Sequence, residues 1–530
     1  MLSLFLRPAA SVKSVAFHRC PMEREMIRKS LDDGTLDEFE ERVDEQAEFL
    51  KDEIRERRLD NPDFTVGLEV EVYAVGGDGR LARVPDDVFE DCGDGLNKEL
   101  GLHNAEINTS PTVFDDDGLR AQEEQVNETL DEADEALGRH GVEGQRFVLD
   151  SIWTVPPAEG SAEYLGSVET DDGFVSAENM RSDSRYEAID NYYIDIAGDV
   201  EIDVPGASLR FPTILAESLA TSVQPHLQIP DSDDLPRYYN TAIRTMAPVL
   251  ALSTNSPFLP PDLYDDPDAS LVDETYDELR IPVFEASVNP PGEYDDKKVR
   301  FPRDIDKTVD VVDKVVEDTP YSPLLSEWDD RTDEGYIDEF WEFEYKRGTY
   351  WRWLRAVIGG EAVGDNDERS VRIEYRPLPT QPTVRDIIGL HTLVSGALAG
   401  MVVDNHPLPS LGWREARDSF YNVVENGIDA RMAWVDRDGD VTHDKNVIYD
   451  ELFEYARLGL EGHGFDDGTY EKYVTPLRTR WEERTTPSVW KKERVREALE
   501  DGDSFEEAVH GMQREYISRT DDHETFAEWI

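Results

Sequence analysis

Four short segments of this 530-residue chain alternate apolar with polar residues, the pattern of a β-strand with one buried face. They are residues 64–73, 102–108, 223–229 and 370–376. Since side chains in a strand alternate faces, each segment gathers its polar groups on one side. These groups are Glu69, Glu71, Asn104, Glu106, Asn108, Gln224, His226, Gln228, Arg372, Glu374 and Arg376. On a single sheet they would line a chamber suited to holding divalent metal and transferring a phosphoryl group.

Each pattern also has a simpler structural interpretation. The glutamates of 64–73 could be the solvated face of an edge strand, His226 a core histidine, and the charges of 370–376 a surface ion-pair ladder. Against this, glutamates on one strand face repel unless a cation lies between them, and hard cations prefer carboxylate oxygen. Basic residues number only 54 against 118 acidic ones. Two arginines flanking Glu374 therefore favour a functional site.

The formal net charge is −64, and the acidic residues are spread along the whole chain. Such an excess repels itself at low salt and is a solubility device of halophiles. We therefore expect a cytoplasm rich in potassium chloride, which screens the repulsion. Aromatic residues make up 10% of the chain, which argues against disorder, and the sequence shows no basic patch for nucleic acid.

The N-terminal segment and the cysteines set further bounds. Cys20 and Cys92 are the only cysteines, which excludes a disulfide framework and a cysteine zinc site. Residues 1–22 contain no acid, so we interpret them as a mis-set start, with translation beginning at Met22, or as a leader. The longest apolar stretch, 387–403, is too short to span a membrane and predicts a buried helix.

Helical and strand patterns alternate without regular βαβ units, which is typical of the α+β class. A hairpin turn is expected at 76–79, an irregular region at 156–208, and a partly surface-exposed, acidic and proline-rich region at 262–335. Helices are expected at 30–59, 116–140, 237–252, 383–403, 411–432 and 447–530. The P-loop, the dinucleotide fingerprint, the nucleophile elbow and the H-E-x-x-H motif are absent from the sequence. ATP, if bound, would be held through metals on a sheet, and the sequence names no nucleotide-binding residues.

At this point the segments resemble, in order, motifs of the glutamate–cysteine ligase type 2 family of carboxylate–amine ligases, relatives of glutamine synthetase. Residues 67–71, Gly-Leu-Glu-Val-Glu, resemble the G-x-E-x-E of the family's first strand. Further similarities lie at 104–107, 223–231, 251–258, 351–355, 372–376 and 426–431. One departure is Gln224, which stands where the family has the first histidine of an H-x-H motif.

The resemblance implies a curved antiparallel sheet, a glutamine synthetase-like half-barrel with helices packed outside. The similarity covers about residues 64–432, and we expect a ligase domain over 64–440, preceded by an N-terminal helix in 23–63. The acidic insertion at about 262–335 and the helical C-terminal extension over 441–530 extend beyond the family pattern. Two or more Mg²⁺ ions would be held by Glu69, Glu71, Glu106, His226 and Glu374.

By the same resemblance, Arg376 would stabilise the transferring phosphoryl group, and Arg355 and Arg372 would bind a substrate carboxylate. ATP would activate the γ-carboxylate of glutamate as an acyl phosphate, and the amine of cysteine would displace phosphate. A ligase with a different amine and a non-catalytic ATP- or metal-binding protein on the same scaffold are the alternatives. All these partners are small molecules; neither nucleic acid nor a membrane is expected, and the sequence does not specify the oligomeric state.

Overall fold

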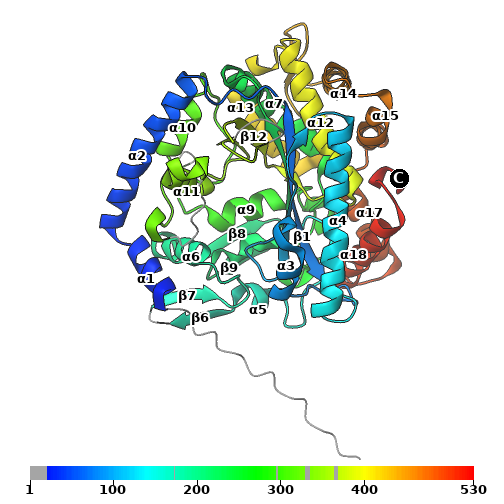
Figure 1. Cartoon of the computed structure of the whole chain (residues 1–530). Coiled ribbons are helices and arrows are strands. Elements are labelled where there is room, and N and C mark those ends of the chain that lie inside the picture. The colour runs from blue at the N-terminus through cyan, green and yellow to red at the C-terminus, as the bar shows by residue number, and fades with distance from the viewer. Residues whose placement is uncertain (1–20, 172, 294–296, 329–334, 363–367) are drawn as a thin grey trace, which may run out of the picture.

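The long strand β1 (Thr65–Val75) forms the centre of the computed structural model (Figure 1). The structure describes residues 21–171, 173–293, 297–328, 335–362 and 368–530. The sheet also contains β2 (Leu96–Lys98), β3 (Asn104–Asn108), β4 (Thr112–Val113), β5 (Arg146–Val148), β10 (Ser222–Gln228), β11 (Leu354–Ile358), β12 (Val371–Tyr375) and β13 (Leu378–Pro379). The main order is β11-β12-β10-β1-β3-β2, and β4, β5 and β13 pair beside it. All named strand pairs are antiparallel, which confirms the predicted α+β class.

The apolar face of the sheet is sealed by helices. Val66, Leu68, Val70 and Val72 of β1 are buried, as their alternation predicts. Helix α7 (Leu235–Ser253) packs on β11 and β12, α12 (Val384–Val403) packs on β10, and α4 (Asp116–His140) runs beside β1 (Figure 1). The polar groups of the strands are therefore left on the opposite face.

Helix α12 is the buried helix that the sequence predicts. Thr383 caps its N-terminus by accepting a hydrogen bond from the backbone N–H of Asp386. A Cβ at Gly400 would clash with the carbonyl oxygen of Tyr455 in α14 (Lys445–Gly462), so glycine permits this close packing. By length and composition α12 could cross a membrane, but 94% of its apolar window is buried inside the protein. Its composition is explained by its place in the core.

Both ends of the described chain are helical, as predicted. Helix α2 (Asp33–Arg55) buries Phe39, Val43 and Leu50 at helical spacing and begins at the cap Asp32. Residues 1–20 of the predicted leader lie outside the described residues. The C-terminal part contains α14, α15 (Asp467–Thr469), α16 (Thr475–Glu483), α17 (Pro487–Asp501) and α18 (Phe505–Asp522).

The prediction that 156–208 is irregular is wrong. The region holds α5 (Ser161–Gly166), the hairpin β6 (Val168–Asp171) with β7 (Phe174–Ala177), α6 (Ser184–Ala197), and the hairpin β8 (Val200–Val204) with β9 (Ala207–Phe211). In β8 the buried residues alternate with exposed acids, a strand pattern that the acidic composition hides.

Parts of 262–335 also reach the interior. Helix α9 (Arg280–Val288) buries Ile281 and Val283, so the interpretation as a surface excursion does not hold there. The other α-helices and strands of the described residues are α1 (Pro21–Ser30), α3 (Asp86–Cys92), α8 (Leu271–Glu274), α10 (Asp310–Val316), α11 (Trp341–Gly348), α13 (Trp413–Asn426), and the hairpin β14 (Trp434–Val435) with β15 (Val441–Thr442).

Candidate active site

The four segments with alternating polar residues do lie in one sheet, and their register aligns the polar groups. Glu71 of β1 lies opposite Glu106 of β3. Glu374 of β12 lies between two neighbours, opposite His226 of β10 and opposite Arg355 of β11. Because facing residues in antiparallel strands share a face, the carboxylates, the imidazole and the guanidinium groups meet on one side of the sheet.

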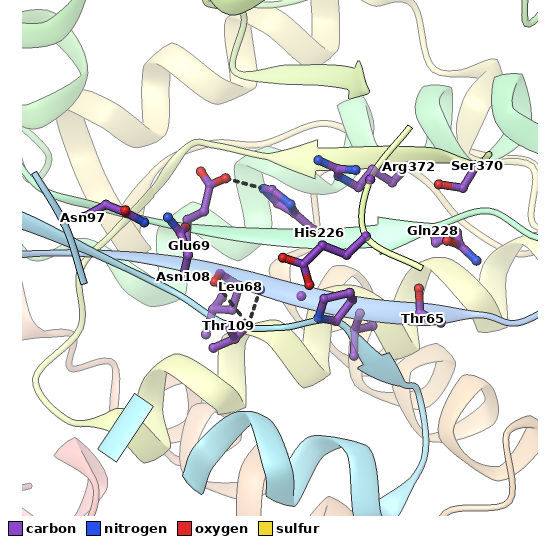
Figure 2. A pocket seen from close by; sticks show the side chains of 15 residues that line it. Thr65, Leu68, Glu69, Asn97, Asn108, Thr109, His226, Gln228, Ser370 and Arg372 are labelled. Carbon is purple, nitrogen blue, oxygen red and sulfur yellow. Dashed lines mark hydrogen bonds and ion pairs between the residues drawn. The ribbon is translucent and has the colours of Figure 1, made fainter. Parts of the chain in front are cut away.

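Three of the predicted metal ligands come together at the centre of this face. Ligand atoms of Glu69, His226 and Glu374 all lie within 4.8 Å of one another. The Nε2 atom of His226 is 3.5 Å from Oε1 of Glu69, and Figure 2 shows the two side chains approaching each other from β10 and β1. One imidazole and two carboxylates form a donor set for a divalent cation.

The state of His226 fits a metal ligand. Its Nε2 is buried and has no hydrogen-bond partner among the described residues. Burial lowers the pKa of His226 to about 3, more than the nearby Glu374 can offset. The imidazole is therefore neutral near pH 7, and a lone pair is available for coordination.

Glu374 is held ionised by arginines. Its Oε2 accepts a hydrogen bond from Nε of Arg355 at 2.6 Å, and Oε1 accepts one from Nη1 of Arg376. Burial would raise the pKa of this carboxyl, but the positive charges of Arg355 and Arg376 outweigh it and lower the pKa well below its ordinary value. The negative charge of Glu374 is therefore kept in a site that water reaches poorly.

Gln224 connects the predicted catalytic arginine to a predicted metal ligand. Its side-chain amide donates to Oε1 of Glu71 at 3.2 Å, and its carbonyl oxygen accepts from Nη1 of Arg376. The second oxygen of Glu71 accepts the backbone N–H of Ser222 at 2.7 Å. The amide uses both its donor and its acceptor, so the residue that departs from the family pattern is integrated in the site.

A second group of carboxylates lies beside the first. Glu71, Glu99, Glu106 and Glu217 line one cavity of about 290 Å³. Burial raises the pKa of all four carboxyls, that of Glu99 to about 7, and repulsion from other glutamates adds to the effect at three of them. A bound cation would relieve this repulsion.

The three arginines proposed from the sequence do not meet at one point. Arg355 and Arg376 line the cavity of the second carboxylate group. Arg372 lies in a neighbouring cavity of about 320 Å³, together with His226 and Gln228 (Figure 2). Glu69 lines both cavities, so the two cavities meet at this carboxylate.

Sequence patterns missed the groups that enter the site from outside the strands. Glu99 directly follows β2, and Glu217 lies in a short 3-10 helix, Ile214–Leu219, where it is the only acid in an apolar run. Buried Arg280 of α9 donates to the carbonyl oxygens of Arg376 and Leu378. A single acid within an apolar segment could have identified Glu217 from the sequence. No comparable sequence pattern identifies Glu99 or Arg280.

Comparisons with known proteins identify the family of this chain. The sequence profile described as glutamate–cysteine ligase family 2 matches residues 65–523. A search of curated proteins finds no match. A solved glutamate–cysteine ligase from Francisella tularensis in complex with AMP is similar with a TM-score of 0.51 and 12% identity, over 88% of this chain and 90% of that one.

Two further structures are more distant. A bifunctional glutathione synthetase from Pasteurella multocida gives a TM-score of 0.49 and 14% identity over 87% of this chain and 53% of that one. A glutamine synthase homologue gives a TM-score of 0.27 and 10% identity over 88% of this chain and 74% of that one. The family profile, in contrast, covers most of the sequence, including all four strands of the site. The chain belongs to glutamate–cysteine ligase family 2.

Proposed function

We propose that this protein is an ATP- and Mg²⁺-dependent ligase that joins the γ-carboxylate of glutamate to the amine of cysteine. The observation that carries the proposal is the meeting of Glu69, His226 and Glu374 with Arg376 on one sheet face, in a member of this family. The similar ligase solved with AMP supports a nucleotide site on such a scaffold.

Mg²⁺ would be held by Glu69, His226 and Glu374, with Glu71 and Glu106 available to a further ion. The chemistry supplied by the bound ion would be positive charge that offsets the charge developing during phosphoryl transfer. The unpartnered Nε2 of His226 and the crowded carboxylates support this assignment.

In the first step, an oxygen of the substrate carboxylate attacks the γ-phosphorus of ATP, and ADP leaves. In the second, the amine nitrogen attacks the acyl carbon, the bond to the phosphate oxygen breaks, phosphate leaves, and the nitrogen loses a proton. Arg376 would donate to the oxygens of the phosphoryl group, where a fixed guanidinium suits spread negative charge. Its bond to Gln224 fixes that guanidinium in place.

A ligase with another amine is the second candidate, and Gln224 in place of a histidine is the observation that favours it. The mechanism and the metal ligands would be unchanged. A non-catalytic binding protein is the third candidate and would bind ATP without releasing ADP.

The test is ADP release with Mg²⁺, ATP and glutamate at molar KCl, the salt of the potassium-rich cytoplasm that we propose, screened over amines including cysteine. We expect release that depends on cysteine, a γ-glutamylcysteine product, and its loss in Glu71→Gln. The matched control Glu124→Gln, at an exposed position of α4, should keep full activity. ADP release with a different amine would identify that amine as the substrate in place of cysteine. If folded protein releases no ADP with any amine, the proposal of a ligase is wrong.

A further inference from the structure

Arg185 is a cation without an acidic partner in a chain dominated by acids. Among the described residues, no carboxylate forms an ion pair with its guanidinium, and its buried Nε has no hydrogen-bond partner. The chain as a whole contains 118 acidic residues and 54 Lys and Arg. The charge of Arg185 is therefore not paired with an acid of the described residues.

The position of Arg185 is also unfavourable for a cation. It is the second residue of α6, directly after Ser184 and the cap Asp183, whose side chain accepts the backbone N–H of Arg185 at 2.8 Å. The N-terminus of a helix carries partial positive charge, so a cation there is destabilising.

The surrounding residues fix where the guanidinium lies. It lies over the ring of Tyr345, 5.1 Å from the ring centroid. At Gly348, the last residue of α11, a Cβ would clash with Nη2 of Arg185, so glycine leaves the space that the side chain occupies. The side chain is thus constrained on two sides before any ligand arrives.

Arg185 lines the cavity that holds the second carboxylate group. The same cavity has an apolar wall made by Ile189, Ile214, Phe284 and Val288. A cation, several carboxylates and an apolar wall around about 290 Å³ are complementary to the carboxylate, the amino group and the side chain of a free amino acid.

The two arginines that the sequence suggested for a substrate carboxylate already have partners. Arg355 donates to Glu374, and Arg372 donates to the carbonyl oxygen of Gly359. Arg185 has no comparable partner and belongs to the region 156–208, which the sequence pattern gave no role.

We propose that Arg185 binds the α-carboxylate of an amino-acid substrate in this cavity. The inference rests on the proposed function. Its chemistry is a charge-assisted pair between a guanidinium and a carboxylate, which glutamate and cysteine both offer. Glu99 and Glu217 line the same cavity and are not assigned to a metal ion, so they would be available to the amino group of the same molecule.

The experiment compares wild type with Arg185→Gln on whole substrates and on analogues that lack the α-carboxylate. The analogues are 4-aminobutyrate for glutamate and cysteamine for cysteine. We expect Arg185→Gln to raise the KM of one amino acid about 10- to 100-fold, the usual loss of a hydrogen bond to a charged group. With the analogue of that amino acid, wild type and Arg185→Gln should have the same KM, because the carboxylate is missing. The KM of ATP should stay unchanged.

Controls separate this result from general damage. Arg210→Gln removes an exposed arginine of β9 that pairs with Glu201, and it should leave every KM unchanged. Arg185→Lys should restore part of the affinity. If Arg185→Gln turns over both amino acids with wild-type KM values, Arg185 does not bind the carboxylate, and the proposed ligase function is unaffected. If wild type itself turns over no amino acid, titration calorimetry measures the binding of glutamate and cysteine instead. Binding that is lost in Arg185→Gln but kept in wild type and Arg210→Gln supports the inference. Equal binding by all three proteins overturns it.

Discussion

The ammonium group of Lys491 lies 2.5 Å from Oδ1 of Asp150, and neither side chain is more than 2% exposed. Lys491 belongs to α17, whereas Asp150 closely follows β5, which pairs with β1. The amide of Gln513 in α18 donates to the other oxygen of Asp150 at 2.8 Å. Two C-terminal helices are therefore joined to the sheet that carries the candidate site. On this basis we propose that the C-terminal extension, residues 441–530, supports the ligase domain over 64–440 directly.

Replacing Lys491 by methionine should destabilise the protein strongly. The change keeps the length of the side chain but leaves the carboxylate of Asp150 buried without its counter-ion, which costs about 3–5 kcal/mol in comparable cases. The measurement is the free energy of unfolding from urea titration at molar KCl. Lys98→Met, which breaks the exposed pair with Asp86, should cost less than about 1 kcal/mol. Equal losses in the two variants would show that the buried pair does not stabilise the fold.

Acid should destabilise the protein in part through His103. Burial lowers the pKa of this imidazole to about 3, and the ring nitrogens form hydrogen bonds with the hydroxyl of Tyr164 and the carbonyl oxygen of Ser218. Because the unfolded state takes up the proton near pH 6.5, stability is present above that pH and falls as the pH drops toward 3. The slope from one such group reaches about 1.4 kcal/mol per pH unit.

His103→Gln should therefore reduce the slope of the unfolding free energy against pH, between pH 6.5 and 3, by up to about 1.4 kcal/mol per pH unit. His140→Gln, at an exposed position beside Asp91, serves as the control. A slope that is unchanged in His103→Gln would mean that the histidine is protonated in the folded protein.

The strand faces could be predicted because their signal is local. A period of two in 64–73 or 370–376 specifies which side chains share a face, and the pairing of Glu71 with Glu106 follows once the strands adjoin. The α+β class and the buried helix α12 rest on the same kind of pattern.

The other groups of the site depend on tertiary packing. Arg185 enters from a helix N-terminus, Glu217 from a 3-10 helix and Arg280 from α9, and each is separated from the strands by long stretches of chain. No periodicity links these residues to the sheet. Their roles become visible only from the cavity that they share or from the carbonyl oxygens that they contact.

The stability of the fold should rise with potassium chloride. A net charge of −64 repels itself, and the screening length falls from about 10 Å at 0.1 M salt to about 3 Å at 1 M. We expect the midpoint of thermal unfolding to increase over this range and then to level off. Neutralising exposed acids of α4 should reduce the increase, because like charges four residues apart repel. The positions are Glu124, Glu128, Asp131, Glu132 and Glu135, each replaced by its amide. A salt response equal to that of wild type would exclude charge repulsion as the cause.

Gln224 offers the sharpest test of how the site is organised. Gln224→Leu keeps a similar volume but removes both the hydrogen bond to Glu71 and the one to Arg376. We expect kcat to fall about 100-fold, the size of effect that follows when reacting groups are misplaced by about 1 Å. Gln224→His should lose less, because a neutral imidazole still offers one donor and one acceptor.

Steady-state kinetics with ATP and both amino acids measures these effects, and calorimetry of Mg²⁺ binding shows whether Glu71 still reaches the ion. Gln125→Leu, at a half-buried position of α4, removes an amide that accepts the backbone N–H of Ser110 and should leave kcat unchanged. If Gln224→Leu retains full turnover, Arg376 is positioned by Glu374 alone, since that carboxylate is its other partner. In that case the histidine of the family pattern and the glutamine of this chain are exchangeable, and the choice of amine does not depend on this position.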